Sequence, residues 1–231
     1  MTRFGILVFS MSFGATAADA QIVADGSLEL GTPNPHWDEF SSGFGSPICS
    51  EASCTGFFGG AHDGDWWAWF GGATQPDIAH LIQEVTIPAG AGPLIFWLNI
   101  TAASGNGVDT MYFAIDDIEL FRVLESDMPD YTGWTEVEID ITAFADGAAH
   151  VIKFASSVTG PFRSNFYVDS IDIASASCAA DFNNDGIVNT LDFLAFLNAF
   201  NAGDPAADFN GDGIINTLDF LAFLNAFNAG C

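Results

Sequence analysis

DFNNDGIVNTLDFLAFLNAFNAG, residues 181–203, is repeated almost unchanged as DFNGDGIINTLDFLAFLNAFNAG, residues 208–230. The first twelve residues of each copy have the pattern of a cation-binding loop, with side-chain oxygens at positions 1, 3, 5, 9 and 12. Position 6 is Gly in both copies, where such a loop turns sharply, and position 7 can offer its backbone carbonyl.

These positions supply carboxylates, side-chain amides and one backbone carbonyl. They are Asp181, Asn183, Asp185, Ile187, Asn189 and Asp192 in the first copy, and Asp208, Asn210, Asp212, Ile214, Asn216 and Asp219 in the second. Oxygen ligands with several carboxylates suit Ca²⁺, and neither loop contains the Cys or His that Zn²⁺ prefers. The pattern predicts two bound Ca²⁺ ions; an Asp/Asn-rich surface turn without metal is the alternative.

Each loop runs into the stretch LDFLAFLNAFNA, whose apolar residues have helical spacing. In the first copy the predicted apolar face contains Leu191, Leu194, Leu197 and Phe200 at three-residue intervals, widened by Phe193 and Phe196. One such helix cannot bury its apolar face alone. The two copies are therefore expected to pack about a pseudo-twofold axis as one small all-α domain.

The duplicated loop followed by a single Leu/Phe-rich helix resembles dockerin repeats. No helical pattern precedes the first loop and position 12 is Asp, which distinguishes the repeat from an ordinary EF-hand. The Gly230-Cys231 ending resembles a subset of dockerin-anchored proteins whose chains finish in Gly-Cys. The resemblance implies docking onto a cohesin-like or cell-envelope scaffold protein, as in complexes for polysaccharide catabolism.

In this family the partner tends to be contacted by loop positions 10 and 11 and by the helix that follows. The matching residues here are Thr190, Leu191, Asn198, Thr217, Leu218 and Asn225. Neither helix contains Lys or Arg, and Asn198 and Asn225 stand where a basic residue is often found.

The other end of the chain has the pattern of an export signal. MTRFGILVFSMSFGATAADA, residues 1–20, has one basic residue, an apolar stretch and a small-residue ending before Gln21. The apolar run is too short for a membrane anchor, and no later segment has the length and apolar character to span a bilayer. We expect a signal peptide at 1–20, a β-domain at 21–176, a helical domain at 177–231, and a secreted, cell-surface-associated protein.

The four cysteines agree with export, because disulfides persist in oxidising compartments. Cys49 and Cys54 are close enough in sequence to pin a loop, and a Cys178–Cys231 bond would clasp both ends of the repeat module. Four cysteines allow three pairings, and the sequence leaves them open. The alternative role for Cys231 is as an attachment handle for a surface-sorting system.

The chain is strongly acidic, with 30 Asp and Glu against 4 Lys and Arg, for a net charge of −26. Such a surface repels nucleic acid and anionic membranes and attracts divalent cations. The 49% hydrophobic content argues against disorder despite this charge.

Between the two ends, the apolar pattern has a period of two residues. Strands are expected at 81–88, 93–102, 111–117, 118–124, 135–142, 150–157 and 165–173, separated by turns rich in Gly, Pro, Asn and Asp. In TEVEIDIT (135–142), Val137, Ile139 and Ile141 are expected to face inward. The predicted fold is mostly β: an antiparallel jelly-roll sandwich followed by the all-α domain of two Ca²⁺ loop–helix repeats.

This β region resembles galactose-binding-like jelly rolls, which include many carbohydrate-binding modules. DGSLELG (25–31) resembles the opening strand of that family, and FYVDSIDI (166–173) its closing strand. The resemblance implies a polysaccharide ligand and a structural Ca²⁺ held by Asp25, Glu29 and Asp169, although Ser170 replaces the usual second acid.

Aromatic residues gather in HDGDWWAWFGG (62–72), where ring faces could stack on sugar. Alternation places Trp67 and Trp69 on one face and Trp66 on the other, and one face has to be core. Trp66, flanked by acidic residues, and Trp37 are the candidate exposed ligand-binding rings.

No catalytic signature accompanies these features. The four histidines are scattered, and no H-E-x-x-H or G-x-S-x-G motif occurs, while acid pairs carry little information in so acidic a chain. We therefore expect a non-catalytic, polysaccharide-binding protein. A surface structural or adhesion protein whose sandwich binds other proteins is the alternative, and a glycoside hydrolase is less favoured.

Overall fold

The computed structural model describes residues 21–54, 59–160, 163–175, 178–183 and 188–229. The predicted signal peptide and the predicted site residues Asp185, Ile187 and Cys231 lie outside these ranges.

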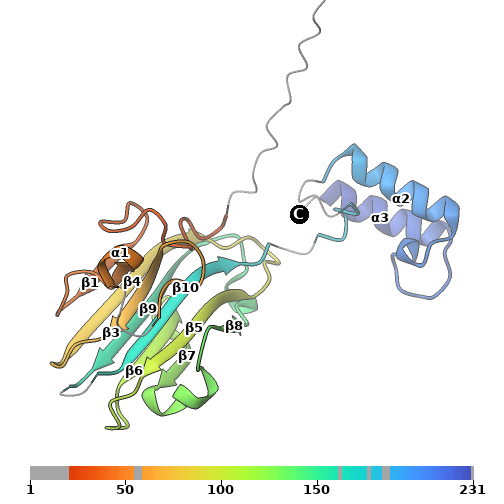
Figure 1. The fold of residues 1–231 in the computed structure, drawn as a ribbon. Helices are drawn as coiled ribbons and strands as arrows, with labels where there is room; N and C mark the ends of the chain where they lie inside the picture. Colours follow the sequence, from red (N-terminus) through yellow and green to blue (C-terminus); the bar gives the residue numbers. More distant parts are fainter. Residues whose placement is uncertain (1–20, 55–58, 161–162, 176–177, 184–187, 230–231) are drawn as a thin grey trace, which may run out of the picture.

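In the described part of the chain, ten strands come first and two long helices follow (Figure 1). The strands are β1 (Asp38–Ser41), β2 (Ile48–Ser50), β3 (Trp66–Gly71), β4 (Asp77–Thr86), β5 (Leu94–Ala102), β6 (Thr110–Ile115), β7 (Ile118–Leu124), β8 (Thr135–Ile139), β9 (Ala149–Val158) and β10 (Asn165–Ile173). The helices are α1 (Glu51–Cys54), α2 (Thr190–Ala202) and α3 (Thr217–Ala229), with short 3₁₀ turns at Glu125–Asp130, Thr142–Phe144 and Pro205–Ala207.

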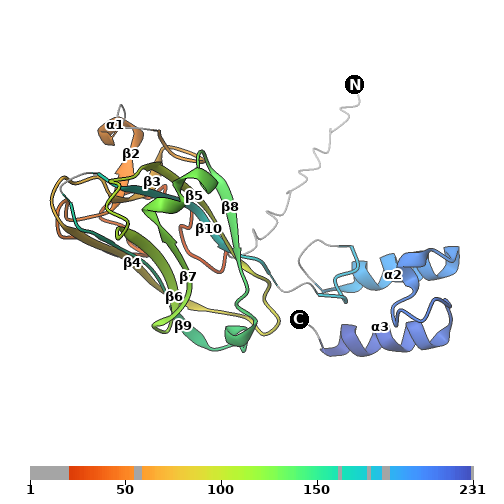
Figure 2. The same ribbon diagram turned by 90° about the horizontal axis from the view of Figure 1, so that it is seen from below.

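The strands form two five-stranded sheets that pack face to face, as Figures 1 and 2 show. The first sheet has the order β1-β4-β9-β6-β7 and the second the order β2-β3-β10-β5-β8. Every strand pair is antiparallel. The predicted fold class, an antiparallel β-sandwich followed by a helical region, is confirmed.

Alternation in the sequence correctly gives the inward face of several strands. Val137 and Ile139 of β8 and the following Ile141 are buried, whereas the acidic residues between them are exposed. β6 and β7 join through Asp116 and Asp117, whose φ angles of 50° and 61° suit a tight two-residue hairpin turn.

The expected opening strand at 25–31 is not a strand. The Leu28 N–H donates to the Asp25 carbonyl over 3.1 Å, and both residues have positive φ, so the segment turns instead of extending. It is attached to β10 where the Ile171 N–H donates to the Gly26 carbonyl over 2.9 Å. A Cβ at Gly26 would lie 1.8 Å from the Ile171 oxygen, so this close approach requires glycine.

The core between the sheets is rich in phenylalanine. Phe96 and Phe113 both contact Phe154, with ring centroids 5.1 Å and 4.8 Å apart, and all three side chains are fully buried. The edge-to-face and tilted arrangements are those that aromatic rings favour. This core holds the two sheets together.

A second, smaller core lies between α2 and α3. Phe196 and Phe223 occupy equivalent positions in the two copies and stack with centroids 4.1 Å apart and planes 1° apart. Phe182 meets the Phe196 ring edge-on at 5.4 Å, and Phe209 meets Phe223 in the same way at 5.5 Å. The matching contacts agree with the pseudo-twofold packing expected from the repeat.

The helix face that packs is only part of the expected one. Leu191 and Leu194 remain 57% and 54% exposed, whereas Phe193, Phe196 and Phe200 belong to the core. The helices are apolar on most sides, so spacing alone did not decide which side is buried. The larger phenylalanine rings bury more apolar area and reach the facing helix.

Candidate functional site

The second predicted Ca²⁺ loop is held by bonds from its acceptor oxygens to its own backbone. Asp208 accepts hydrogen bonds from the N–H groups of Asp212 (3.1 Å) and Gly213 (2.8 Å), and Asp212 accepts one from Ile214 (2.8 Å). Gly213 has a φ of 83°, a left-handed conformation that favours glycine. The oxygens of positions 1 and 5 are thereby turned toward the centre of the loop.

The acid at position 12 is fully buried in both copies. Asp219 accepts from the N–H groups of Asn210 (3.1 Å) and Asn216 (2.7 Å), and these bonds, with that of Asn216 foremost, hold the pKa of its carboxyl below its usual range. In the first copy Asp192 accepts from Asn183 (3.1 Å) and Asn189 (2.8 Å) in the same way. This acid ties positions 3 and 9 together.

Position 9 also begins the helix. The Asn189 side chain accepts a hydrogen bond from the Leu191 N–H over 2.7 Å, and together with Asp192 it forms a capping box at the start of α2. Asn216 accepts equivalently from Leu218 over 2.8 Å. Loop and helix are therefore one cooperative unit in each copy.

The donor set of each loop fits Ca²⁺ in its chemistry, since it offers carboxylate, amide and carbonyl oxygens. Within the described ranges, no three His, Cys, Asp or Glu side chains are gathered into a group that could hold a metal ion. The oxygens of Asp208, Asn210 and Asp212 in the second loop accept hydrogen bonds from backbone N–H groups, and each oxygen has a second lone pair with which it could coordinate an ion.

The predicted docking residues all lie on the surface. Thr190, Leu191, Asn198, Thr217, Leu218 and Asn225 are exposed. With Leu194 and Leu221 they form two exposed rows of equivalent residues, which we call the docking stripes: Leu191, Leu194 and Asn198 on α2, and Leu218, Leu221 and Asn225 on α3. The stripes are apolar and amide in character and carry no charge.

Cys49 and Cys54 are joined by a disulfide that closes the short segment from β2 through α1. Cys178 is also disulfide-bonded, and its predicted partner, Cys231, lies outside the described residues.

Of the three acids expected to hold a structural ion in the sandwich, two lie close together and the third bonds elsewhere. Asp169 is fully buried, and burial, with a contribution from the negative charge of Glu29, raises the pKa of its carboxyl to about 7. Glu29 accepts hydrogen bonds from the Asp65 and Trp66 N–H groups. Asp25 instead accepts from Asn34 Nδ2 over 2.7 Å. Glu29 and Asp169 are thus neighbours, and Asp25 has a separate role in holding a loop.

Neither tryptophan expected to contact ligand is a free ring. Trp37 is only 3% exposed, and its indole N–H donates to the Asp25 carbonyl over 3.0 Å, so it belongs to the core and not to a binding surface. Trp66 is half-buried, packs against the core, and lies so close to Gly31 that a Cβ there would be 2.8 Å from the ring. Trp69, on the other face of β3, is the tryptophan of this strand that lines a cavity.

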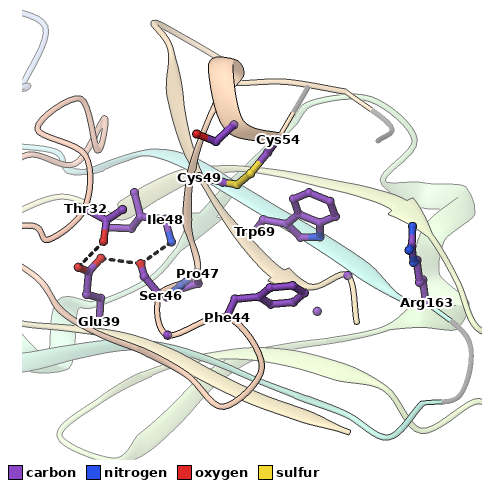
Figure 3. Close-up of a pocket in the computed structure, with 14 residues that line it drawn as sticks. Thr32, Glu39, Phe44, Ser46, Pro47, Ile48, Cys49, Cys54, Trp69 and Arg163 are labelled. Atoms are coloured by element: carbon purple, nitrogen blue, oxygen red, sulfur yellow. Dashed lines mark hydrogen bonds between the residues drawn. A yellow bond between two sulfur atoms is a disulfide. The ribbon is translucent and has the colours of Figure 1, made fainter. Parts of the chain in front are cut away.

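Trp69 lines a cavity of about 670 Å³ between the β1–β2 loop, the end of β3 and the start of β10 (Figure 3). Phe44, which is 63% exposed, and Arg163 also line it, and the Cys49–Cys54 disulfide contributes one wall. The volume lies within the range typical of small-ligand sites. An aromatic pair with a few polar groups is suited to binding a ligand that has both apolar and polar faces.

The Trp69 ring is fixed in place. Its indole N–H donates to Asn165 Oδ1 over 3.1 Å, and its edge meets the Tyr167 ring at 5.4 Å. A Cβ at Gly72 would lie 2.7 Å from the indole, so the glycine lets the ring lie flat against the backbone. The ring is pre-organised for stacking.

One end of the cavity carries Glu39, whose carboxylate organises the surrounding loops. It accepts hydrogen bonds from Thr32 Oγ1 (2.7 Å), the Asn34 N–H (3.2 Å) and Ser46 Oγ (2.7 Å). Three donors already engage this carboxylate, so it contributes shape and negative charge more than a free acceptor.

Ser164, the residue that follows Arg163, is held by two buried acids. Ser164 is fully buried, and its Oγ lies 2.7 Å from Asp109 and 2.8 Å from Glu125. Burial opposes ionisation of both acids, but their hydrogen bonds outweigh it and keep the pKa of Asp109 and the pKa of Glu125 below their usual range. The Ser164 carbonyl also accepts from the Gly72 N–H over 3.0 Å, which ties the Arg163 segment to the end of β3.

Sequence reasoning missed this cavity because its lining comes from distant segments. Phe44 lies in a Gly/Ser-rich loop, and an aromatic residue in such a loop is the one signal that could have drawn attention to it. No local pattern relates it to Trp69 or Arg163.

The geometry defines the class of the protein: a β-sandwich with an aromatic-lined cavity, joined to a duplicated loop–helix module. Residues 179–228 match the family model of the dockerin type I domain, and this part of the chain is a dockerin type I domain. None of the curated protein sequences compared with the chain matches it. Within the described ranges, the structure contains no helix with the length and apolar character needed to cross a bilayer.

Solved structures similar to the chain include several β-sandwich modules. TmCBM61 in complex with β-1,4-galactotriose has a TM-score of 0.48 at 16% identity, with 67% of this chain and 98% of that chain covered. The K1 cleaved adhesin domain of Lys-gingipain from Porphyromonas gingivalis W83 has a TM-score of 0.45 at 12% identity, with 64% of this chain and 95% of that chain covered. The CBM22-1 xylan-binding domain of Paenibacillus barcinonensis Xyn10C has a TM-score of 0.40 at 14% identity, with 69% of this chain and 98% of that chain covered. These values leave the ligand of the sandwich to be inferred from its own side chains.

Proposed function

We propose that this chain is a secreted, non-catalytic protein whose dockerin domain attaches it to a cohesin-like or cell-envelope scaffold while its sandwich binds polysaccharide. The observation that carries the proposal is the dockerin type I domain placed after a β-sandwich with an aromatic-lined cavity. Residues 1–20 would be the signal peptide, residues 21–176 the binding domain, and residues 177–231 the anchoring domain.

Dockerin domains bind calcium in general, and here each loop is proposed to hold one Ca²⁺ through its own six predicted ligands. The ion would neutralise carboxylates that otherwise repel one another and would fix the loop ahead of its helix. A disulfide between Cys178 and Cys231 would hold the two ends of this module together.

A third ion is proposed at Glu29 and Asp169 in the sandwich. Burial, foremost, and the negative charge of the neighbouring Glu29 raise the pKa of Asp169, and both effects would favour a cation between the two carboxyl groups. A divalent cation would offset this negative charge and tie the 25–31 segment to β10. Asp25 would act through the loop that it holds.

The docking stripes are the proposed contact surface for the scaffold. Because they lack Lys and Arg, the partner surface is expected to be apolar and not strongly acidic. The test measures binding of the mature protein to immobilised cohesin modules and to envelope extract in Ca²⁺. Binding should be lost with chelator and in the Leu194→Asp/Leu221→Asp variant; retention in both cases would overturn the docking role.

The cavity at Phe44 and Trp69 is the proposed polysaccharide site, because the exposed Phe44 ring and the fixed Trp69 ring can stack on the apolar faces of sugars. Affinity electrophoresis on plant and algal glycans tests it. Phe44→Ala should weaken binding roughly tenfold, the loss expected for an aromatic anchor. Phe40→Ala is the matched control, since Phe40 is exposed but stacks on His80 outside the cavity.

Equal losses in the two phenylalanine variants would place the ligand elsewhere. If the wild-type protein binds none of the glycans, the polysaccharide role is overturned, and an adhesion protein whose sandwich binds other proteins is favoured.

A further inference from the structure

The cavity has opposite charges at its two ends. Figure 3 shows Glu39 at one end and Arg163 at the other, with the Phe44 and Trp69 rings between them. The Glu39 carboxylate oxygens accept hydrogen bonds from Thr32, Asn34 and Ser46, which hold this acid at its end of the cavity. A ligand in the cavity would therefore meet a polarised environment.

A cation in this position is unusual for so acidic a chain, which has only 4 Lys and Arg against 30 Asp and Glu. The other two cations among the described residues, Arg122 and Lys153, lie in the first sheet and not among the residues that line the cavity. Among the described residues that line the cavity, Arg163 is the only Lys or Arg.

The position of Arg163 is set by the fold. Its neighbour Ser164 is bonded through Oγ to the buried acids Asp109 and Glu125. The Ser164 carbonyl accepts from Gly72, next to which Trp69 lies. Cation and ring are thus held on one connected piece of backbone, an arrangement that fixes their spacing for a ligand touching both.

We propose that the ligand is an anionic saccharide: a sugar ring lies between Phe44 and Trp69 and its carboxylate or sulfate group bonds to Arg163. This rests on the proposed polysaccharide-binding function and specifies its ligand class. The guanidinium presents paired N–H donors that match the oxygens of either anion. Glu39 repels the anionic group from the opposite end and so orients the sugar.

The experiment measures affinity of the mature, Ca²⁺-loaded protein for three polymers by affinity electrophoresis and calorimetry. Polygalacturonate carries carboxylates, a sulfated galactan carries sulfate esters, and β-1,4-galactan is neutral. The Arg163→Gln variant should lose at least about tenfold in affinity for the preferred anionic polymer, the size expected for charge-assisted hydrogen bonds. Its affinity for any neutral polymer that binds should change less than about twofold.

Arg122→Gln is the matched control, because it removes the same charge from a residue outside the cavity. It should leave all affinities unchanged, and thermal unfolding should show that both variants are folded. The polygalacturonate and sulfated galactan arms decide whether carboxylate or sulfate is recognised.

The outcomes separate the two proposals. If the neutral polymer binds as well as the anionic ones, or if Arg163→Gln weakens both equally, the anionic ligand class is overturned while polysaccharide binding stands. If no polymer of either class binds, the polysaccharide role fails and the ligand class fails with it.

Discussion

Single carboxylates set much of the local electrostatics in this molecule because few cations oppose them. At Asp169, burial and a neighbouring acid raise the pKa, whereas at Asp109 and Glu125 hydrogen bonds lower it despite burial. Asp169 also accepts hydrogen bonds from the His62, Asp63 and Ser170 N–H groups, so the contrast depends on the balance between burial and hydrogen bonding: burial dominates at Asp169, and hydrogen bonds dominate at the other two acids. His150 shows the complementary case of a base held between two acids.

His150 is predicted to stabilise the fold more at acidic than at alkaline pH. Hydrogen bonds to Asp116 (2.7 Å), foremost, and to Asp146 (3.1 Å) raise the pKa of its imidazole. A raised folded-state pKa gives stability that is complete below the unfolded value of about 6.5 and is lost as pH rises through the folded value.

The measurement compares the melting temperature of the wild-type protein with that of His150→Gln at about pH 6 and about pH 9. The wild-type protein should lose more over this interval than the variant. Asp169 titrates in both proteins, so its contribution cancels in the difference. Parallel pH profiles would show that the two acids do not stabilise a protonated His150.

At the scale of elements, the two helices divide their apolar residues between a core and a surface. The Phe196 and Phe223 rings form the stacked centre, while Leu194 and Leu221 remain in the docking stripes. Two residues only two positions apart, Leu194 and Phe196, therefore have different tasks.

Truncating each residue should separate these tasks. Phe196→Ala is expected to cost about 3–5 kcal/mol, enough to unfold so small a domain, because it empties the centre of the core. Leu194→Ala should cost less than about 0.5 kcal/mol, because that side chain is more than half exposed. Urea unfolding monitored by far-UV circular dichroism measures both, and similar losses would contradict the assignment of faces.

The elements with strong local patterns could be predicted from sequence, and those set by tertiary contacts could not. Alternation in 135–142 gave the buried face of β8, and the repeat gave both helices. The 25–31 segment instead turns, because its carbonyls meet β10 and Leu28 is drawn into the core. The packed side of α2 was ambiguous because apolar residues lie all round it.

The expectation that Trp37 is an exposed ring is wrong for a related reason. Alternation divides Trp66 from Trp69 but does not say which face meets the opposite sheet, and Trp37 is buried by a loop whose course the sequence does not reveal. The cavity depends on residues far apart in the chain, and so only the folded structure brings them together.

At the scale of the whole molecule, two cores with different chemistry share one chain. The sandwich is held by a large apolar core, whereas the dockerin domain has a small core and loops rich in acid. The two should respond differently to loss of calcium.

Chelation is predicted to unfold residues 178–231 first and to leave most of the sandwich folded. Carboxylates that converge in the loops repel one another without the ion, and the small helical core cannot offset that repulsion. Differential scanning calorimetry and circular dichroism with EDTA should show loss of helix at low temperature and a separate, later β transition. An unchanged helical signal in EDTA would contradict coupling of ion binding to folding.

The bond network of Asp109, Ser164 and Glu125 joins the two layers of the sandwich. Asp109 precedes β6 and Glu125 follows β7 in the first sheet, while Ser164 precedes β10 in the second. Substitutions at Asp109 or Glu125 are therefore expected to shift the Arg163 segment without altering the residues that line the cavity. Natural variation at these two acids would then change the ligand preference of the proposed site. A comparison of the lining residues alone between relatives would not detect that change.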